Sequence, residues 1–258
     1  MMKQLFSKIL LVLIGCSLLC FVRPHKKITL FSIGDSTMAW YDVQEWSKQN
    51  GGENYPLRGW MMMMPQFFKS NVEIKDEAIS GISSKSFRDE GAWKKVIDAV
   101  KPGDYVFIQF GHNDEKPDSA NHTDARTSFR QNLLNYVNET KAKGANPVLF
   151  TSIARRKFDA NGKLEDTHGD YVTVVRELAK EINVPLIDLN KKTGELVEHL
   201  GPEESKKLYL YIEPGAFTQL PEGKKDDTHL CVYGATKVAE LAVEGILEQH
   251  LGLAKYLK

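Results

Sequence analysis

The sequence predicts an α/β protein with a central parallel sheet of about five strands and helices on both faces. Strand-like segments alternate with helix-like segments along most of the 258 residues. The strand-like segments are apolar along most of their length, which is typical of parallel strands that are buried on both faces. No internal repeat, low-complexity tract or linker interrupts this region, so we expect a single domain.

The predicted strands are five segments rich in β-branched and aromatic residues: 28–34, 72–80, 104–111, 147–154 and 184–190. Elsewhere apolar residues recur every three or four positions, as on one face of a helix, within 93–100, 129–137, 172–182 and 235–247. Pro102 and Gly103 end the first of these helices, and Gly144 follows the second. We interpret the run Met61–Met64 as core packing on an early helix.

The N-terminus differs from the rest of the chain. Lys3 and Lys8 precede an apolar run over 9–22, which is short for a membrane span and typical of an export signal. Residues 13–16, Leu-Ile-Gly-Cys, resemble a bacterial lipoprotein box that would acylate Cys16, but the apolar run continues past it. We therefore expect residues 1–22 to be a signal peptide or a lipoprotein signal, with the domain at 27–258. The protein would be exported: periplasmic, extracellular or lipid-anchored at a bacterial surface.

Composition excludes some functions. The 34 basic and 34 acidic residues balance, with a pI near 7.1, so no basic surface for nucleic acid is expected. We find no glycine-rich phosphate loop, no His-Glu-x-x-His and no paired cysteines, and we predict neither a cofactor nor a resident metal. His112, Asn113, Asp114 and His122 crowd one loop and leave metal chemistry as the weaker alternative.

Polar clusters follow the predicted strands, at the edge of a parallel sheet where ligands bind. Ser36 comes directly after the first strand, where Asp-Ser-Thr forms either a turn with a helix N-cap or a nucleophile site. A serine nucleophile needs a base and a carboxylate that orients the base. His229, with Asp226 three residues before it, supplies both from one tight turn.

An oxyanion needs hydrogen-bond donors, and three candidates follow successive strands. They are the Ser36 N–H, the backbone N–H of Gly81 and the side-chain amide of Asn113. Any one of these residues alone has an ordinary structural explanation. Their joint placement favours a serine-dependent hydrolase.

A rival base exists, because Asp-Thr-His occurs at 166–168 as well as at 227–229. Glu165 stands three residues before His168, as Asp226 does before His229. We favour His229 because it lies just before the closing helix. We expect His168 on the substrate side of the site or in a helix cap.

Together these motifs resemble the four sequence blocks of the SGNH (GDSL-type) hydrolases: Gly34-Asp35-Ser36, Gly81, Gly111-His112-Asn113-Asp114 and Asp226-x-x-His229. The segments 101–114, 155–171 and 227–235 resemble the rhamnogalacturonan acetylesterase branch more closely. The resemblance implies a flavodoxin-like three-layer α/β/α sandwich. It also implies Ser36 as nucleophile, His229 as base, Asp226 as its orienting carboxylate, and an oxyanion hole of Ser36, Gly81 and Asn113. The second block and the methionine run depart from the family pattern, which bears on the substrate groove.

The resemblance further implies an acetylated polysaccharide or oligosaccharide as substrate, of the pectic class. Pectic polymers carry uronates, which Arg155 and Arg156 could bind through their planar guanidinium groups. An internally ion-paired or solvated arginine pair is the alternative. Trp40, near the nucleophile, is a candidate for stacking on sugar rings. Two further functions stay open: an esterase or thioesterase acting on another acyl substrate, such as acetyl-xylan or a lipid, and a non-catalytic carbohydrate-binding protein.

Overall fold

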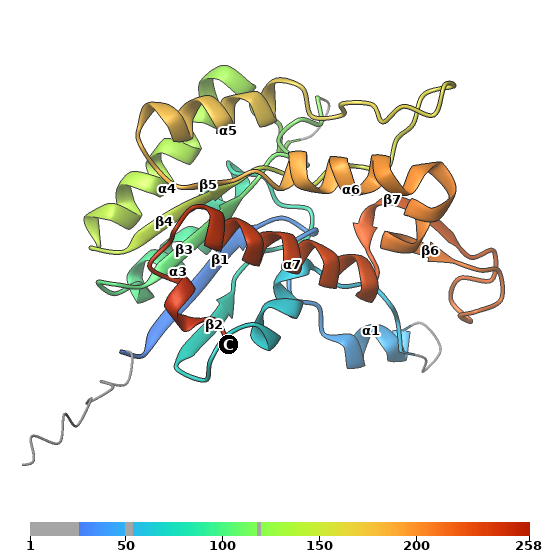
Figure 1. Cartoon of the computed structure of the whole chain (residues 1–258), viewed down its shortest axis with the longest axis horizontal. Helices are drawn as coiled ribbons and strands as arrows, with labels where there is room; N and C mark the ends of the chain where they lie inside the picture. Colours follow the sequence, from blue (N-terminus) through green and yellow to red (C-terminus); the bar gives the residue numbers. More distant parts are fainter. Residues whose placement is uncertain (1–25, 50–53, 118–119) are drawn as a thin grey trace, which may run out of the picture.

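A five-stranded parallel sheet forms the centre of the computed structural model, which describes residues 26–49, 54–117 and 120–258 (Figure 1). Its strands are β1 (Ile28–Gly34), β2 (Val72–Asp76), β3 (Tyr105–Gln109), β4 (Asn146–Phe150) and β5 (Leu186–Ile187). They lie in the order β2-β1-β3-β4-β5. This is the flavodoxin-like order, so the predicted fold class is confirmed.

The helices connect the strands and cover the sheet. The α-helices are α1 (Val43–Gln49), α2 (Ser86–Asp89), α3 (Ala92–Ala99), α4 (Arg130–Ala142), α5 (Asp170–Glu181), α6 (Leu189–Glu204) and α7 (Val232–Glu248). Shorter helical segments are η1 (Trp60–Gln66), η2 (Ala125–Phe129), η3 (Ser205–Leu208) and η4 (Ala254–Tyr256). No helix in the described part of the chain is long and apolar enough to cross a bilayer. The predicted signal at 1–22, with Cys16, lies outside the described residues.

Alternate residues of β1 face the two halves of the core, which makes the fold a three-layer sandwich. Leu30 packs in the half that contains η1, α6 and α7. Phe31 and Ile33 pack in the half that contains α3, α4 and α5. In Figure 1, α7 and α6 lie across one face of the sheet, while α4 and α5 lie on the other. The methionine run fits this core: Met61 and Met64 are fully buried in η1, as expected, although η1 is a 3₁₀ helix.

A second, two-stranded antiparallel sheet lies outside the main sheet (Figure 1). It pairs β6 (Tyr209–Ile212) with β7 (Lys224–Leu230) and leads directly into α7. This hairpin was not predicted from the sequence, because the residues of β7, Lys-Lys-Asp-Asp-Thr-His-Leu, show no apolar alternation. Helix α6 was not predicted either, because only Leu189, Thr193 and Val197 are buried in it. The predicted strand at 184–190 shortens to two residues because α6 begins at Leu189.

Close packing of α7 against η3, which leads into the hairpin, depends on Gly234. A Cβ atom at this position would lie 1.8 Å from the carbonyl oxygen of Leu208. We predict that Gly234→Ala lowers the free energy of unfolding by about 1–3 kcal/mol or more, because backbone must move to relieve the overlap. Urea denaturation measures the change.

Gly194 in α6 provides the matched control. The nearest atom to a Cβ there is Leu164 Cδ2 at 3.7 Å, an ordinary contact. Gly194→Ala should therefore stabilise the protein by about 0.4–1 kcal/mol, because alanine restricts the unfolded chain more than glycine does. Equal effects of the two substitutions would contradict the packing described for α7.

Candidate active site

Ser36 lies in a tight turn directly after β1, at the carboxyl edge of the sheet. The turn is closed by the backbone N–H groups of Met38 and Ala39, which both donate to the carbonyl oxygen of Asp35. Gly34 is required just before it, because a Cβ there would lie 2.6 Å from the backbone oxygen of Gln109 on the neighbouring strand β3. The Ser36 side chain therefore leaves the sheet at a fixed point.

A network of buried polar side chains stabilises the turn that carries Ser36. Asp35 Oδ1 accepts hydrogen bonds from the backbone N–H and the hydroxyl of Thr37, at 2.9 and 2.8 Å. Gln109 Nε2 donates to the same hydroxyl at 2.8 Å, and Trp60 Nε1 donates to Gln109 Oε1 at 3.0 Å. Burial raises the pKa of Asp35, and the hydrogen bonds from Thr37 offset this only in part. Side chains from β3 and η1 thus fix the backbone that presents Ser36.

Ser36, His229 and Asp226 form one line of hydrogen bonds. His229 Nε2 lies 2.9 Å from Ser36 Oγ, and His229 Nδ1 lies 2.9 Å from Asp226 Oδ2. The Ser36 side chain is nearly buried, whereas that of His229 is 31% exposed. The three residues named from the sequence as nucleophile, base and orienting carboxylate are therefore brought together by the fold.

An irregularity in β7 places the carboxylate against the imidazole. Tyr209 pairs with Leu230, but the next residue of β6, Leu210, pairs with Asp226, so residues 227–229 bulge out of the ladder. Within the bulge, Asp226 Oδ1 accepts the backbone N–H groups of Thr228 and His229, at 3.0 and 2.9 Å. The second oxygen is then free to face the ring. The spacing of Asp226 and His229 predicted a tight turn, and this turn is present within β7.

The charge of Asp226 is secured by its surroundings. Burial raises the pKa of this carboxyl, but the hydrogen bonds from the His229 ring and from the His229 and Thr228 backbone outweigh it and hold the pKa well below its usual range. Lys224 Nζ also lies 3.3 Å from Asp226 Oδ2. The carboxylate is therefore ionised at neutral pH and can orient the imidazole with Nδ1 protonated.

The three oxyanion-hole candidates have groups suited to that task. Gly81 has a φ of +82°, and nothing lies within 4 Å of a Cβ built on it, so its backbone is approachable. Asn113 is buried, and its Nδ2 donates to the carbonyl oxygen of Ile82 at 2.9 Å, while Oδ1 accepts from Lys116 Nζ at 2.7 Å. One hydrogen of the Asn113 amide remains for a substrate oxygen.

Both arginines expected to recognise uronate are engaged within the protein. Arg155 pairs with Glu115, and Arg156 pairs with Asp227 at 2.7 Å. Arg156 also donates to the hydroxyl of Tyr211 at 2.9 Å. The internally ion-paired alternative therefore describes both side chains in this structure, and their contact with substrate stays a prediction. Trp40 is 51% exposed, which leaves its ring accessible to a ligand.

The second Asp-Thr-His copy does not reach Ser36 in this structure. Asp166 Oδ1 accepts the backbone N–H groups of His168 and Gly169, at 2.9 and 3.1 Å, just before α5. The His168 ring is buried, with Nδ1 2.8 Å from Glu115 Oε2 and Nε2 2.9 Å from the carbonyl oxygen of Ile153. Because both nitrogens are occupied, this ring supports the loops around it, and a direct substrate contact for it is untested.

The sequence suggested a metal site in the loop at 112–122, but its candidate ligand side chains do not come together. His122 Nδ1 contacts the backbone oxygen of Asp114 at 2.9 Å, and the Asp114 carboxylate accepts from Ser84 and Thr123. Within the described residues, the group whose ligand atoms come together is His112, Glu115 and His168, all within 4.8 Å of one another. Glu115 was not among the residues selected from the sequence. Only its position after Asp114 could have drawn attention to it.

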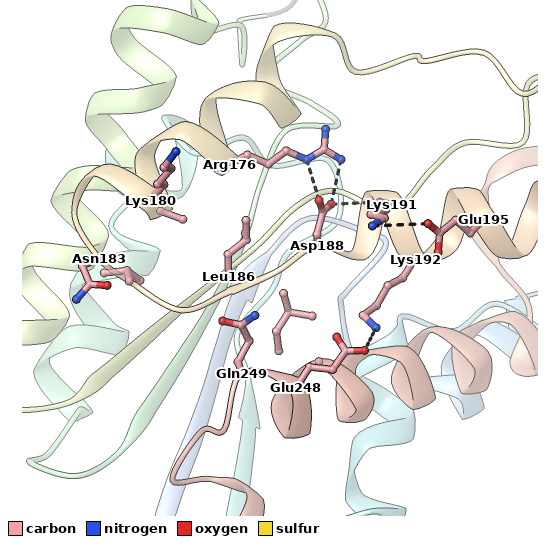
Figure 2. Close-up of a pocket in the computed structure, with 14 residues that line it drawn as sticks. Arg176, Lys180, Asn183, Leu186, Asp188, Lys191, Lys192, Glu195, Glu248 and Gln249 are labelled. Atoms are coloured by element: carbon pink, nitrogen blue, oxygen red, sulfur yellow. Dashed lines mark hydrogen bonds and ion pairs between the residues drawn. The ribbon is translucent and has the colours of Figure 1, made fainter.

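A cavity of about 640 Å³ lies elsewhere, beside β5 and between α5, α6 and α7 (Figure 2). It shares no lining residue with the Ser36 site. Its charged side chains pair with one another: Arg176 with Asp188 at 2.8 Å, and Lys192 with Glu248 at 2.7 Å. This cavity holds no nucleophile with a base, so it does not compete for the hydrolytic role.

A serine hydrogen-bonded to a histidine that contacts a carboxylate, at the carboxyl edge of a parallel sheet, defines a serine hydrolase site. The chain belongs to the GDSL-like lipase/acylhydrolase family, which it matches over residues 32–217. It is therefore a carboxylic-ester hydrolase, and the family resemblance given by its sequence motifs is confirmed. The match ends before Asp226 and His229, whose relation to Ser36 comes from the geometry.

The chain is 40% identical over 232 residues to the rhamnogalacturonan acetylesterase RhgT of Bacillus subtilis, covering 90% of this chain and 95% of that protein. It is 32% identical over 227 residues to the probable rhamnogalacturonan acetylesterase YesY of the same organism, covering 88% of this chain and 95% of that protein. Among solved structures, the B. subtilis protein YxiM is similar with a TM-score of 0.73 and 26% identity. That alignment covers 88% of this chain and 58% of YxiM.

One buried carboxyl at the edge of the site titrates in an unusual range. Asp76 ends β2, shortly before Gly81, and its Oδ1 accepts the Ser32 hydroxyl at 2.6 Å and the Ala78 N–H at 3.2 Å. Burial raises the pKa of Asp76 to about 7, against the lowering effect of these hydrogen bonds. The folded protein thus keeps a proton that the unfolded chain releases near its ordinary pKa of about 4.

We predict that this proton makes stability fall as pH rises. The contribution of Asp76 is full below about pH 4 and is lost as pH approaches 7, with a slope of up to about 1.4 kcal/mol per pH unit in that window. Asp76→Asn removes the titration and should flatten the corresponding part of the curve. Urea unfolding of both proteins across this pH range measures it. An unchanged slope in the variant would show that Asp76 is ionised in the folded state.

Proposed function

We propose that this protein is exported and removes acetyl groups from rhamnogalacturonan, with Ser36 as nucleophile, His229 as base and Asp226 as orienting carboxylate. The observation that carries the proposal is the row of hydrogen bonds from Ser36 through His229 to Asp226. It occurs in a chain that is 40% identical to RhgT over 90% of its length. Export rests on the sequence of residues 1–22. Whether Cys16 carries a lipid or is removed with a cleaved signal is left open in this proposal.

The first half of the reaction transfers the acetyl group to the enzyme. Ser36 Oγ attacks the acetyl carbonyl carbon while His229 Nε2, 2.9 Å away, takes the hydroxyl proton. The tetrahedral intermediate collapses, the bond from the carbonyl carbon to the sugar oxygen breaks, and His229 gives its proton to that oxygen. The sugar leaves with a free hydroxyl, and Ser36 carries the acetyl group.

The second half returns the enzyme to its starting state. A water molecule attacks the acetyl carbonyl carbon while His229 takes one of its protons, and the second tetrahedral intermediate releases acetate. His229 then restores the proton to Ser36. In both halves the Ser36 N–H, the Gly81 N–H and the Asn113 amide would bind the oxyanion, each donor contributing about 10²–10³ in turnover.

The substrate is the least constrained part of the proposal. Trp40 offers an accessible ring for stacking on a sugar. Because Arg155 and Arg156 are paired with carboxylates of the protein, binding a uronate through either guanidinium would require it to exchange partners. Acetyl-xylan and lipid esters are the alternative ester substrates, and a carbohydrate-binding role without catalysis is the alternative to an enzyme.

We expect acetate release from acetylated rhamnogalacturonan to exceed release from acetylated homogalacturonan and acetyl-xylan, and to vanish in Ser36→Ala. An acetate assay on the three polymers measures both. Serine-dependent release that favours xylan would keep the mechanism and reject the pectic substrate. Equal release by wild type and Ser36→Ala would reject Ser36 as nucleophile. No release from any polymer by the folded protein would favour a lipid ester or a binding role.

Asp226→Asn should lower the turnover number on the order of 10⁴-fold, because the amide favours the wrong imidazole tautomer while filling the same space. Steady-state hydrolysis of p-nitrophenyl acetate measures the loss, and circular dichroism checks the fold. Glu165→Gln is the matched control, since Glu165 stands three residues before the other Asp-Thr-His histidine and pairs with the exposed Lys157. If the two variants lost equal activity, the orienting role of Asp226 would be rejected.

A further inference from the structure

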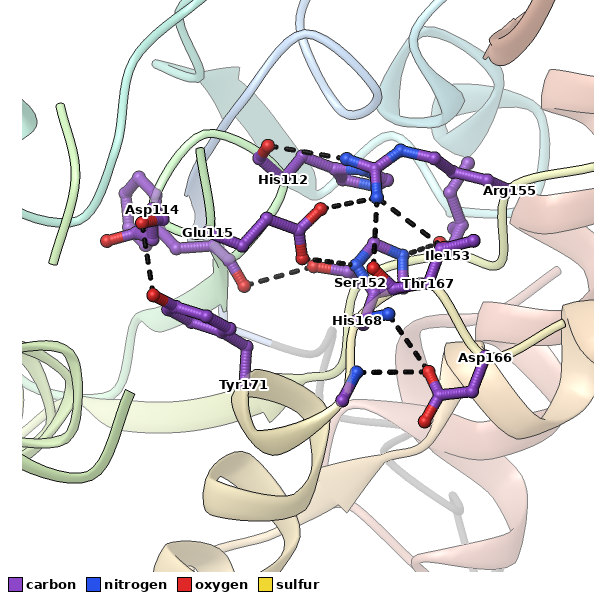
Figure 3. A network of polar contacts seen from close by, with 12 residues as sticks. His112, Asp114, Glu115, Ser152, Ile153, Arg155, Asp166, Thr167, His168 and Tyr171 are labelled. Atoms are coloured by element: carbon purple, nitrogen blue, oxygen red, sulfur yellow. Dashed lines mark hydrogen bonds and ion pairs between the residues drawn. The ribbon is translucent and has the colours of Figure 1, made fainter. Parts of the chain in front are cut away.

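The second Asp-Thr-His copy has no part in the reaction described above, yet it supplies one of the most buried polar side chains near the site. Figure 3 shows the His168 ring enclosed by Glu115, Arg155 and the backbone of Ile153. The side chain of His168 is 1% exposed and that of Glu115 is 13% exposed. Polar side chains buried this deeply are usually hydrogen-bonded, and both ring nitrogens of His168 have partners.

The partners of His168 determine where its protons are. The carbonyl oxygen of Ile153, 2.9 Å from Nε2, can only accept, so Nε2 carries a hydrogen. Nδ1 lies 2.8 Å from Glu115 Oε2, and the other oxygen of Glu115 is bound by Arg155. A carboxylate paired with a guanidinium has no proton to donate. The hydrogen between Nδ1 and Glu115 therefore also belongs to His168.

We propose that His168 is an imidazolium, protonated at both ring nitrogens, and that it acts as a positioning residue for the oxyanion hole. Arg155, Glu115 and His168 then carry alternating charges: positive, negative and positive. Each hydrogen bond in it is charge-assisted, which makes it about twice as strong as a neutral one.

This chain of charges acts on the turn that carries Asn113. The backbone N–H of Glu115 donates to the carbonyl oxygen of Gly111 at 3.0 Å, so Glu115 closes the same turn. Arg155 Nη2 also donates to the carbonyl oxygen of His112 at 3.3 Å, next to the Asn113 peptide. Arg155 and His168 come from the segments after β4 and before α5, and they hold the turn from outside (Figure 3).

The groups that face His168 are consistent with one added positive charge there. Glu115 and His112 face it from the turn after β3, Arg155 from the segment after β4, and Asp166 from its own loop. The His112 ring lies edge-to-face on the His168 ring, with 4.7 Å between centroids. Burial and the neighbouring cations hold the pKa of His112 well below its usual range, so His112 is the neutral member of the pair.

A metal ion bound by His112, Glu115 and His168 explains these contacts less well. It would replace the proton that Nδ1 shares with Glu115 at a normal hydrogen-bond distance of 2.8 Å. It would also place a second cation on a carboxylate that Arg155 already holds. A proton on Nδ1 accounts for the contact between His168 and Glu115 without that repulsion.

Nitrogen-15 NMR of histidine-labelled protein tests the protonation directly. At pH about 7.5, one unit above the ordinary titration point of histidine, both His168 nitrogens should show the imidazolium signature. The resonance is assigned through the backbone, and the result depends neither on the Ser36 mechanism nor on any variant folding. A neutral His168 ring at this pH would overturn the proposal.

Glu115→Gln tests the positioning role, which rests on the ester hydrolysis proposed above. The glutamine oxygen can accept from Arg155 while its N–H donates to Nδ1, so the shape is kept and His168 becomes neutral in the same NMR experiment. With p-nitrophenyl acetate we expect kcat to fall at least about tenfold and KM to change less than about twofold, because the oxyanion contact forms in the transition state.

Arg176→Gln is the matched control. It also breaks a partly buried arginine–carboxylate pair, with Asp188 beside the cavity of Figure 2, and should leave kcat within about twofold of wild type. A Glu115→Gln variant with a neutral His168 and wild-type kcat would reject the positioning role. Equal losses in both variants would also reject it, because general destabilisation would then account for the change.

Discussion

The hydrogen bond between Ser36 and His229 joins two residues 193 positions apart in sequence, and the rest of the site is arranged around it. The serine end is fixed by β1, whose exit is anchored through Thr37 and Gln109 to the neighbouring strand. The histidine end belongs to a hairpin that is not part of the main sheet. Its position depends on contacts outside its own strands, since two strands alone are marginally stable.

Two adjacent arginines after β4, Arg155 and Arg156, contact two different parts of the site. Arg156 pairs with Asp227 in the bulge that carries His229, and its backbone N–H donates to the Asp227 carbonyl oxygen at 2.9 Å. Arg155 turns the other way, to Glu115 and the carbonyl oxygen of His112 beside Asn113. One segment thereby connects the hairpin that carries His229 to the turn that carries Asn113. Both guanidinium groups are engaged in these contacts, so both arginines have a structural role in this structure.

The parts of the site that could be predicted from the sequence depend on residues that lie close together along the chain. The apolar run of β1 that stops at Gly34 locates Ser36, and the spacing of Asp226 and His229 places a carboxylate beside an imidazole. The roles of Arg155 and Arg156 were not predictable, because their partners lie 40 and 71 residues away. The hairpin was not predicted because β7 is almost entirely polar and shows no apolar alternation. Glu115 and Gln109 carry no motif; only the packed structure shows what they contact.

The most direct test of the account is to identify the side chain that carries the acetyl group during turnover. Wild-type protein mixed with p-nitrophenyl acetate is quenched in acid within one turnover, digested and mapped by mass spectrometry. If Ser36 is the nucleophile, the peptide that contains Ser36 will carry an acetyl group, and fragmentation will locate it on Ser36 itself. Acetylation of another residue at the rate of turnover, or turnover at the wild-type rate in Ser36→Ala, would contradict it.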